Sequence, residues 1–138
     1  KNITVLGISR GAMVGGMVAA RGKDIKNLVL IAGAYDLEAL YNKLDDSPLK
    51  RNITEEGGKE TYQFRERSVL SHAEKIQAKT LILHGKRDRE PTFKNAKDLY
   101  YLLKSSGTDV KFQAFDSGHK IPIKERNEVI DSFLLNNK

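Results

Sequence analysis

The chain has 138 residues, of which 39% are hydrophobic and 30% are charged, values that fit one folded globular domain and exclude a disordered tract. It contains no cysteine, which excludes disulfides, a thiol nucleophile and a thiolate metal site, and it has no apolar run long enough to cross a membrane. The formal net charge of +6 comes from lysines and arginines that are spread along the chain rather than clustered, so we expect a solvated basic surface and no nucleic-acid partner.

The chain opens with the pattern of a strand, a tight turn and a helix. The apolar, β-branched run from Ile3 to Leu6 is typical of a buried strand. The small residues from Ala12 to Arg21 predict a helix that ends before a glycine. Between them, Gly7-Ile8-Ser9-Arg10-Gly11 matches G-x-S-x-G, the motif of a nucleophile elbow, which requires this strand and helix on its two sides.

Each position of the motif has an expected role. Ser9 is the candidate nucleophile, held in a strained turn that keeps its hydroxyl clear of the backbone. We expect Gly7 and Gly11 to leave room where the helix and the strand come close. The backbone amide of Arg10 is expected to point at the place where an oxyanion develops. The stretch therefore predicts a serine hydrolase.

The next part of the chain contains a second strand, a helix and an irregular segment. The continuous apolar run from Asn27 to Gly33 is of the kind that parallel sheets bury on both faces. Asp36 is the expected N-cap of a helix from Leu37 to Leu44. From Asp45 to Arg67 the sequence is polar and rich in helix breakers, so we expect an irregular excursion or lid near the mouth of the active site.

The rest of the chain continues the alternation of strands and helices. The expected elements are a short helix over Ser68–Ile76 capped by Ser68 or Ser71, a strand over Thr80–Gly85, a helix over Thr92–Ser105, a strand near the sheet edge over Asp109–Phe115, and a last helix over Ile121–Leu135. This alternation predicts an α/β fold with a mostly parallel sheet flanked by helices.

Two residues that follow later strands can complete the chemistry of Ser9. A hydroxyl nucleophile needs a base, and the base needs a third group that holds its tautomer. Asp88 and His119 each come just after a predicted strand, so all three residues lie at the carboxyl edge of the sheet. The order serine, acid, histidine is that of α/β-hydrolases. Asp116 is the alternative acid, although it is very close in sequence to His119.

The remaining histidines and glycines predict structural roles. His84 lies inside an apolar strand and is expected to be a hydrogen-bonded core residue, and His72 is expected to be structural or exposed. The three histidines are scattered singly, so we expect no catalytic metal. Gly57 and Gly58 lack the surrounding pattern of a phosphate-binding loop. No cofactor is therefore expected.

The chain resembles the C-terminal part of an α/β-hydrolase catalytic domain, nearest to the prolyl oligopeptidase and dienelactone hydrolase branches. The resemblance rests on Gly7–Gly11, Arg67–Ile76, Leu81–Asp88 and Gly118–His119 and covers nearly the whole chain. It implies that Ser9 is the nucleophile, His119 the general base and acid, Asp88 the residue that orients His119, and the Arg10 amide half of an oxyanion hole.

The resemblance also implies a function and a larger context. It implies a serine hydrolase that cleaves an ester or peptide bond of a small substrate through an acyl-enzyme, with a prolyl-oligopeptidase-like peptidase favoured. The alternatives are a carboxylesterase, or a catalytically silent hydrolase-like binding module. In the family, further strands precede the nucleophile strand, and one of their loops supplies the second oxyanion amide. We therefore expect residues 1–138 to be a single partial domain, to associate with one another through the open edge of the first strand, and to be cytoplasmic.

Overall fold

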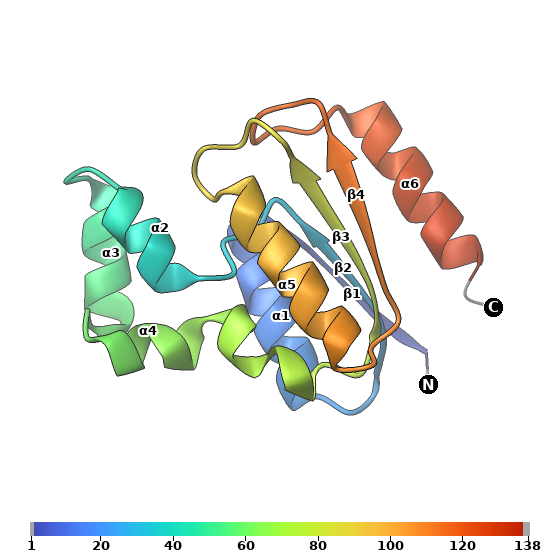
Figure 1. The fold of residues 1–138 in the computed structure, drawn as a ribbon, viewed down its shortest axis with the longest axis horizontal. Coiled ribbons are helices and arrows are strands. Elements are labelled where there is room, and N and C mark those ends of the chain that lie inside the picture. The colour runs from blue at the N-terminus through green and yellow to red at the C-terminus, as the bar shows by residue number, and fades with distance from the viewer. Residues whose placement is uncertain (1, 137–138) are drawn as a thin grey trace.

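The computed structural model describes residues 2–136 and contains one four-stranded sheet with helices on both faces (Figure 1). The strands are β1 (Ile3–Ile8), β2 (Ile25–Ile31), β3 (Lys79–Gly85) and β4 (Val110–Phe115). The helices are α1 (Arg10–Arg21), α2 (Leu37–Lys43), α3 (Pro48–Gly57), α4 (Thr61–Arg67), α5 (Phe93–Ser105) and α6 (Ile123–Leu135), together with the 3₁₀-helix η1 (Val69–Lys75). Residues 1, 137 and 138 of the predicted domain lie outside the described part.

All neighbouring strands are parallel, and their spatial order is β1-β2-β3-β4. The predicted α/β fold with a parallel sheet is confirmed, as is the edge position of β4. In β2, every residue from Leu28 to Ile31 is buried, because helices cover both faces of this interior strand. The strand therefore shows a continuous apolar run instead of the alternation of a half-exposed strand.

Two apolar layers hold the helices against the sheet. On one face, α1, η1 and α5 pack on side chains such as Leu28, Leu30 and Ile82. On the other face, Ile130 and Phe133 of α6 pack on a second set, which comprises Val29, Ile31, Leu81 and Leu83. Because successive residues of a strand point to opposite faces, each interior strand contributes to both layers. This fixes the strands in register, and with them the loops at their carboxyl ends.

The segment from Asp45 to Arg67 is helical, so the prediction of an irregular excursion is wrong for its backbone. It forms α3 and α4, which project to one side of the sheet together with α2 (Figure 1). The N-terminus of α3 has two features typical of a helix start. Ser47 Oγ accepts a hydrogen bond from Lys50 N, and a proline occupies the first turn. At the start of α4, Gln63 Oε1 accepts a hydrogen bond from Glu60 N.

The short helices α2, α3 and α4 are stabilised by a small apolar cluster that they form with one another. The buried members of this cluster are Leu37, Leu44, Ile53 and Phe64. Each helix has too few turns to be stable alone, so the contacts among α2, α3 and α4 decide their conformation. Ser68 also joins them, because its Oγ accepts a hydrogen bond from Leu37 N at 2.9 Å and donates one to Phe64 O at 2.7 Å. The expected capping of the following helix by Ser68 is therefore not made by its side chain, whereas Asp36 does cap α2.

The outer edge of β1 has no neighbouring strand in the described residues. Leu6 and Ile8 are 47% and 45% exposed, so apolar side chains of this edge strand face outward on one side of the sheet. Self-association through this edge stays a prediction. In residues 2–136, no helix is both long and apolar enough to cross a membrane.

The two glycines of the elbow differ in how closely they are packed. A Cβ placed on Gly7 would lie 2.1 Å from the carbonyl oxygen of Gly11, so this position accepts no side chain. Apart from its chain neighbours and the adjacent backbone of α1, a Cβ on Gly11 would meet no atom of the described residues within 4 Å. The strand and the helix therefore come close at Gly7 but not at Gly11.

This difference predicts opposite effects of two similar substitutions. Gly7→Ala should lower the free energy of unfolding by about 1–3 kcal/mol, because the added methyl group forces β1 and α1 apart. Gly11→Ala, the matched control on the same turn, should leave it unchanged or raise it by up to about 1 kcal/mol through helix propensity. Urea titration of the full-length protein measures both values. Equal destabilisation by the two substitutions would contradict this packing.

Candidate active site

Ser9 is the single residue between β1 and α1, and its backbone is strained. Its φ and ψ angles are 57° and −117°, in a region that residues with a side chain rarely adopt. Hydrogen bonds hold this conformation, since Ser9 N donates to Ile31 O at 2.7 Å and Ser9 O accepts from Ala12 N at 3.0 Å. Strand and helix thus fix the backbone of the elbow, as the motif predicts.

His119 lies in the loop after β4 and joins Ser9 to Asp88. Its Nε2 is 3.0 Å from Ser9 Oγ, and its Nδ1 is 2.8 Å from Asp88 Oδ2. A carboxylate only accepts hydrogen bonds, so Nδ1 carries the proton of the neutral ring. Nε2 then presents its lone pair to the hydroxyl of Ser9. The three predicted residues therefore meet in the geometry of a base between a nucleophile and an acid.

Asp88, in the loop after β3, is a buried acid. Its side chain is 1% exposed, and its Oδ1 accepts a hydrogen bond from Glu90 N at 3.2 Å. Asp116, the alternative acid, has a side chain that is 84% exposed and pairs with Arg87 at 2.8 Å. Asp88, and not Asp116, is therefore the acid in contact with the His119 ring.

The loops that carry Asp88 and His119 are fastened to each other. Lys86 N donates a hydrogen bond to Phe115 O at 2.8 Å, and Arg87 N donates one to Ser117 O at 2.9 Å. A Cβ on Gly85 would lie 2.2 Å from the carbonyl oxygen of Gly118, so the two backbones touch at this point. The Asp88 carboxylate and the His119 imidazole are thereby held next to each other at one edge of the sheet.

His84 is a further residue at this site. It is fully buried on β3, with Nε2 3.0 Å from Pro91 O and 3.2 Å from Asp88 Oδ2. Burial lowers the pKa of His84, although the Pro91 carbonyl and the Asp88 carboxylate oppose this effect. The expected core position is confirmed, but in the described residues Nδ1 has no hydrogen-bond partner, so the ring is only half satisfied.

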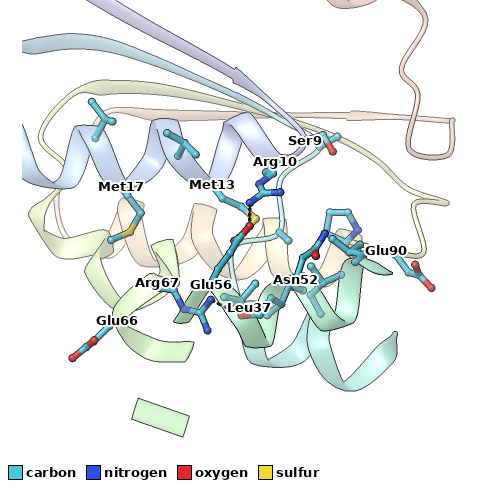
Figure 2. A pocket seen from close by; sticks show the side chains of 18 of the residues that line it. Ser9, Arg10, Met13, Met17, Leu37, Asn52, Glu56, Glu66, Arg67 and Glu90 are labelled. Carbon is cyan, nitrogen blue, oxygen red and sulfur yellow. Dashed lines mark hydrogen bonds and ion pairs between the residues drawn. The ribbon is translucent and has the colours of Figure 1, made fainter. Parts of the chain in front are cut away.

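A cavity of about 460 Å³ opens beside Ser9 (Figure 2). Helix α1 forms one wall, and the α2 and α3 segments form the facing wall. Its apolar lining includes Met13, Met17, Leu37, Leu40, Leu49 and Ile53. The segment from Asp45 to Arg67, predicted as an excursion or lid, therefore contributes directly to the cavity next to the serine.

An ion pair connects the elbow to the facing wall of this cavity. The guanidinium of Arg10 on α1 donates to Glu56 Oε1 on α3 (Figure 2). Both side chains are at least half exposed, so the pair is screened by water and salt. Arg67 also stabilises α3, because it donates hydrogen bonds to Ile53 O at 3.0 Å and to Gly58 O at 2.8 Å.

The backbone amide of Arg10 is at the N-terminal end of α1, and such helix ends favour a nearby anion. Arg10 is the first residue of α1, and the first amides of a helix have no acceptor within the helix. The positive end of the helix dipole adds to this effect.

In residues 2–136, no group of three or more histidine, aspartate or glutamate side chains is arranged to hold a metal ion.

Residues 1–135 match the prolyl oligopeptidase family of peptidases. The chain belongs to this family. This chain is 26% identical over 132 residues to an uncharacterized peptidase of Bacillus subtilis (strain 168), YtmA. The match covers 93% of this chain and 51% of the relative. The chain thus spans about half the length of that curated relative.

Solved structures show the same fold. An acylaminoacyl peptidase of Pyrococcus horikoshii superposes with a TM-score of 0.84 at 20% identity over 99% of this chain and 24% of its own. A dipeptidyl peptidase 4 of Porphyromonas gingivalis gives 0.82 at 20% identity, over 99% of this chain and 20% of its own. An esterase of Pyrococcus furiosus gives 0.73 at 18% identity, over 98% of this chain and 54% of its own. The α/β-hydrolase fold as a partial domain is confirmed.

The ion pair between Arg10 and Glu56 predicts a local effect on α3. Glu56→Gln should speed amide hydrogen exchange in α3 about two- to five-fold, the range expected for loss of an exposed pair. Exchange in α6 should not change, because this helix packs on the opposite face of the sheet. Glu55→Gln, which changes an exposed glutamate of α3 that makes no ion pair in the described residues, is the control for loss of one negative charge on the same helix. Equal exchange in α3 in both variants would contradict a tie between α3 and the elbow.

Proposed function

We propose that the protein containing this chain is a serine hydrolase that cleaves peptide bonds through an acyl-enzyme. The observation that carries the proposal is the continuous contact from Ser9 Oγ to His119 Nε2 and from His119 Nδ1 to Asp88 Oδ2, at 3.0 and 2.8 Å. Membership of the prolyl oligopeptidase family supports it. The strained serine backbone and the buried acid are the further features that such chemistry requires.

The first half of the proposed reaction transfers the acyl group to the enzyme. Ser9 Oγ attacks the carbonyl carbon of the scissile bond while its proton moves to His119 Nε2. Asp88 stabilises the imidazolium that forms and keeps its proton on Nδ1. When the tetrahedral intermediate collapses, the bond to the leaving amine breaks and His119 gives the amine its proton. An ester of Ser9 remains.

The second half of the reaction returns the enzyme to its starting state. Water attacks the acyl-enzyme carbonyl while His119 Nε2 takes one of its protons. Collapse of the second tetrahedral intermediate breaks the bond to Ser9 Oγ, which regains a proton from His119. In both halves the negative charge on the carbonyl oxygen is stabilised by the backbone amide of Arg10 at the start of α1.

The cavity beside Ser9 supports a substrate with an apolar group next to the scissile bond. Met13 and Met17 supply flexible apolar contacts, and Ile53 a further apolar one, within a space of about 460 Å³, enough for a large side chain or acyl group. Arg10 and Glu56 at the wall place a charge of each sign near the rim. Peptidase activity is preferred over carboxylesterase activity because the family is one of peptidases.

The assignment of Ser9 predicts the behaviour of a fluorophosphonate probe. In the full-length protein, the probe should form a bond between its phosphorus and Ser9 Oγ with loss of fluoride, since the neighbouring imidazole takes the serine proton. Ser9→Ala should abolish labelling and hydrolysis of both an amide and an ester of the same apolar acyl group. In-gel fluorescence and mass spectrometry of the labelled peptide provide the measurement.

Each other outcome of this experiment has a definite meaning. Ser71→Ala, a serine on η1 outside the site, is the control and should label like the wild type. Labelling at a residue other than Ser9, or no labelling of the full-length protein, would refute the proposed function. Cleavage of the ester with no cleavage of the amide would replace the peptidase with a carboxylesterase.

The two candidate acids predict different kinetic losses. Asp88→Asn should lower kcat about 10⁴-fold, because an amide in this place favours the wrong tautomer of His119. Asp116→Asn should leave kcat within about two-fold of the wild type, since it removes only an exposed ion pair with Arg87. Steady-state hydrolysis of the amide substrate measures both. A large loss in Asp116→Asn with little effect of Asp88→Asn would contradict the assignment.

A further inference from the structure

His84 contributes a fully buried imidazole that the proposed reaction does not use. It lies on β3, and the ring of Phe93 packs against it with centroids 6.4 Å apart. Its Nε2 is located between two oxygen atoms, Pro91 O at 3.0 Å and Asp88 Oδ2 at 3.2 Å. The same Asp88 Oδ2 also contacts His119 Nδ1 at 2.8 Å. Two imidazoles therefore meet at one carboxylate oxygen.

The protonation state of His84 follows from these neighbours. A carbonyl and a carboxylate both accept hydrogen bonds, so Nε2 must carry a proton. Nδ1 is buried and has no hydrogen-bond partner in the described residues, so a second proton there would leave an unpaired buried donor. Burial acts in the same direction by lowering the pKa of His84. The ring is thus neutral, and its one N–H group donates a hydrogen bond to Pro91 O while Nε2 lies 3.2 Å from Asp88 Oδ2, so the positive end of this N–H dipole is close to the carboxylate.

This N–H group has an effect on Asp88 that its other neighbours do not supply. A buried carboxylate must be compensated by donors, and Glu90 N occupies the other oxygen, Oδ1. In the described residues the Oδ2 atom accepts a hydrogen bond from His119, whose ring is partly exposed and lies on a loop, and without His84 no second N–H group would lie close to this atom. The N–H of His84 comes instead from an interior strand, so it fixes the carboxylate relative to the sheet.

We propose that His84 is a positioning residue, which holds the Asp88 carboxylate in the orientation that receives His119 Nδ1–H. The proposal rests on the proposed function, because it assigns His84 a role in the reaction of Ser9. His84 acts through Asp88 and does not contact the substrate. The competing interpretation is a core residue that only anchors the loop at Pro91, and the two make different predictions.

The experiment replaces His84 in the full-length protein by residues that keep or remove the N–H group. In His84→Gln, the terminal amide can place an N–H near the position of Nε2, whereas His84→Leu fills the space without a donor. His84→Leu should lower kcat about 10- to 100-fold, the usual range for loss of such a supporting group, with KM within about two-fold of the wild type. His84→Gln should restore kcat to within about three-fold of the wild type.

A second readout does not depend on turnover. The proton on His119 Nδ1, which faces Asp88, should give a low-field NMR signal in the wild type and in His84→Gln. This signal should shift upfield or disappear in His84→Leu. Thermal unfolding reports whether each variant folds, and His84→Asn, whose amide is too short to reach Asp88, replaces His84→Leu if that variant does not fold.

The outcomes separate this proposal from the proposed function. Wild-type kcat and an unchanged signal in a folded His84→Leu variant would overturn the positioning role. Equal losses in His84→Gln and His84→Leu would also overturn it, because the ring and not its N–H group would then matter. A wild type that shows the signal but no Ser9-dependent turnover would refute the proposed function, while the effect of His84 on the signal would still decide the role of His84.

Discussion

The contact between His119 Nδ1 and Asp88 Oδ2, 2.8 Å long, is the interaction on which the rest of the site depends. It fixes the tautomer of His119, and the tautomer decides that Nε2 can accept the proton of Ser9. A carboxylate that is 1% exposed would be costly without such donors. Two donors bind Asp88, namely the ring of His119 and the amide of Glu90, and Nε2 of His84 lies 3.2 Å from the same Oδ2 atom that His119 contacts.

The parallel sheet makes this contact between residues far apart in sequence. β1, β3 and β4 end at the same edge, so the residues that follow them are brought together wherever they lie in the chain. Two apolar layers fix the strands, and backbone hydrogen bonds join the loops after β3 and β4. The strained conformation of Ser9 persists because β2 and α1 hold it on both sides. The packing of the sheet therefore fixes the relative positions of Ser9, Asp88 and His119 at its carboxyl edge.

The sequence predicts the strands and the convergence of Ser9, Asp88 and His119 because these depend on local patterns and on one rule of parallel sheets. It does not predict α3 and α4, since helices this short are stabilised by their mutual contacts around Ile53 and Phe64 rather than by their own sequence. The capping signals at Ser47 and at Glu60 were present but lay within a polar, breaker-rich stretch. His84 was predicted to be buried, but its contact with Asp88 depends on the path of the loop after β3, which no local pattern specifies.

The most direct test of the central claim is a crystal structure of the full-length protein after reaction with a fluorophosphonate. The account predicts phosphorus bonded to Ser9 Oγ and a phosphoryl oxygen within hydrogen-bond distance of the Arg10 amide. It also predicts His119 Nδ1 still in contact with the Asp88 carboxylate. A structure in which the phosphonate is bound to Ser9 while His119 lies out of reach of both Ser9 and Asp88 would contradict it.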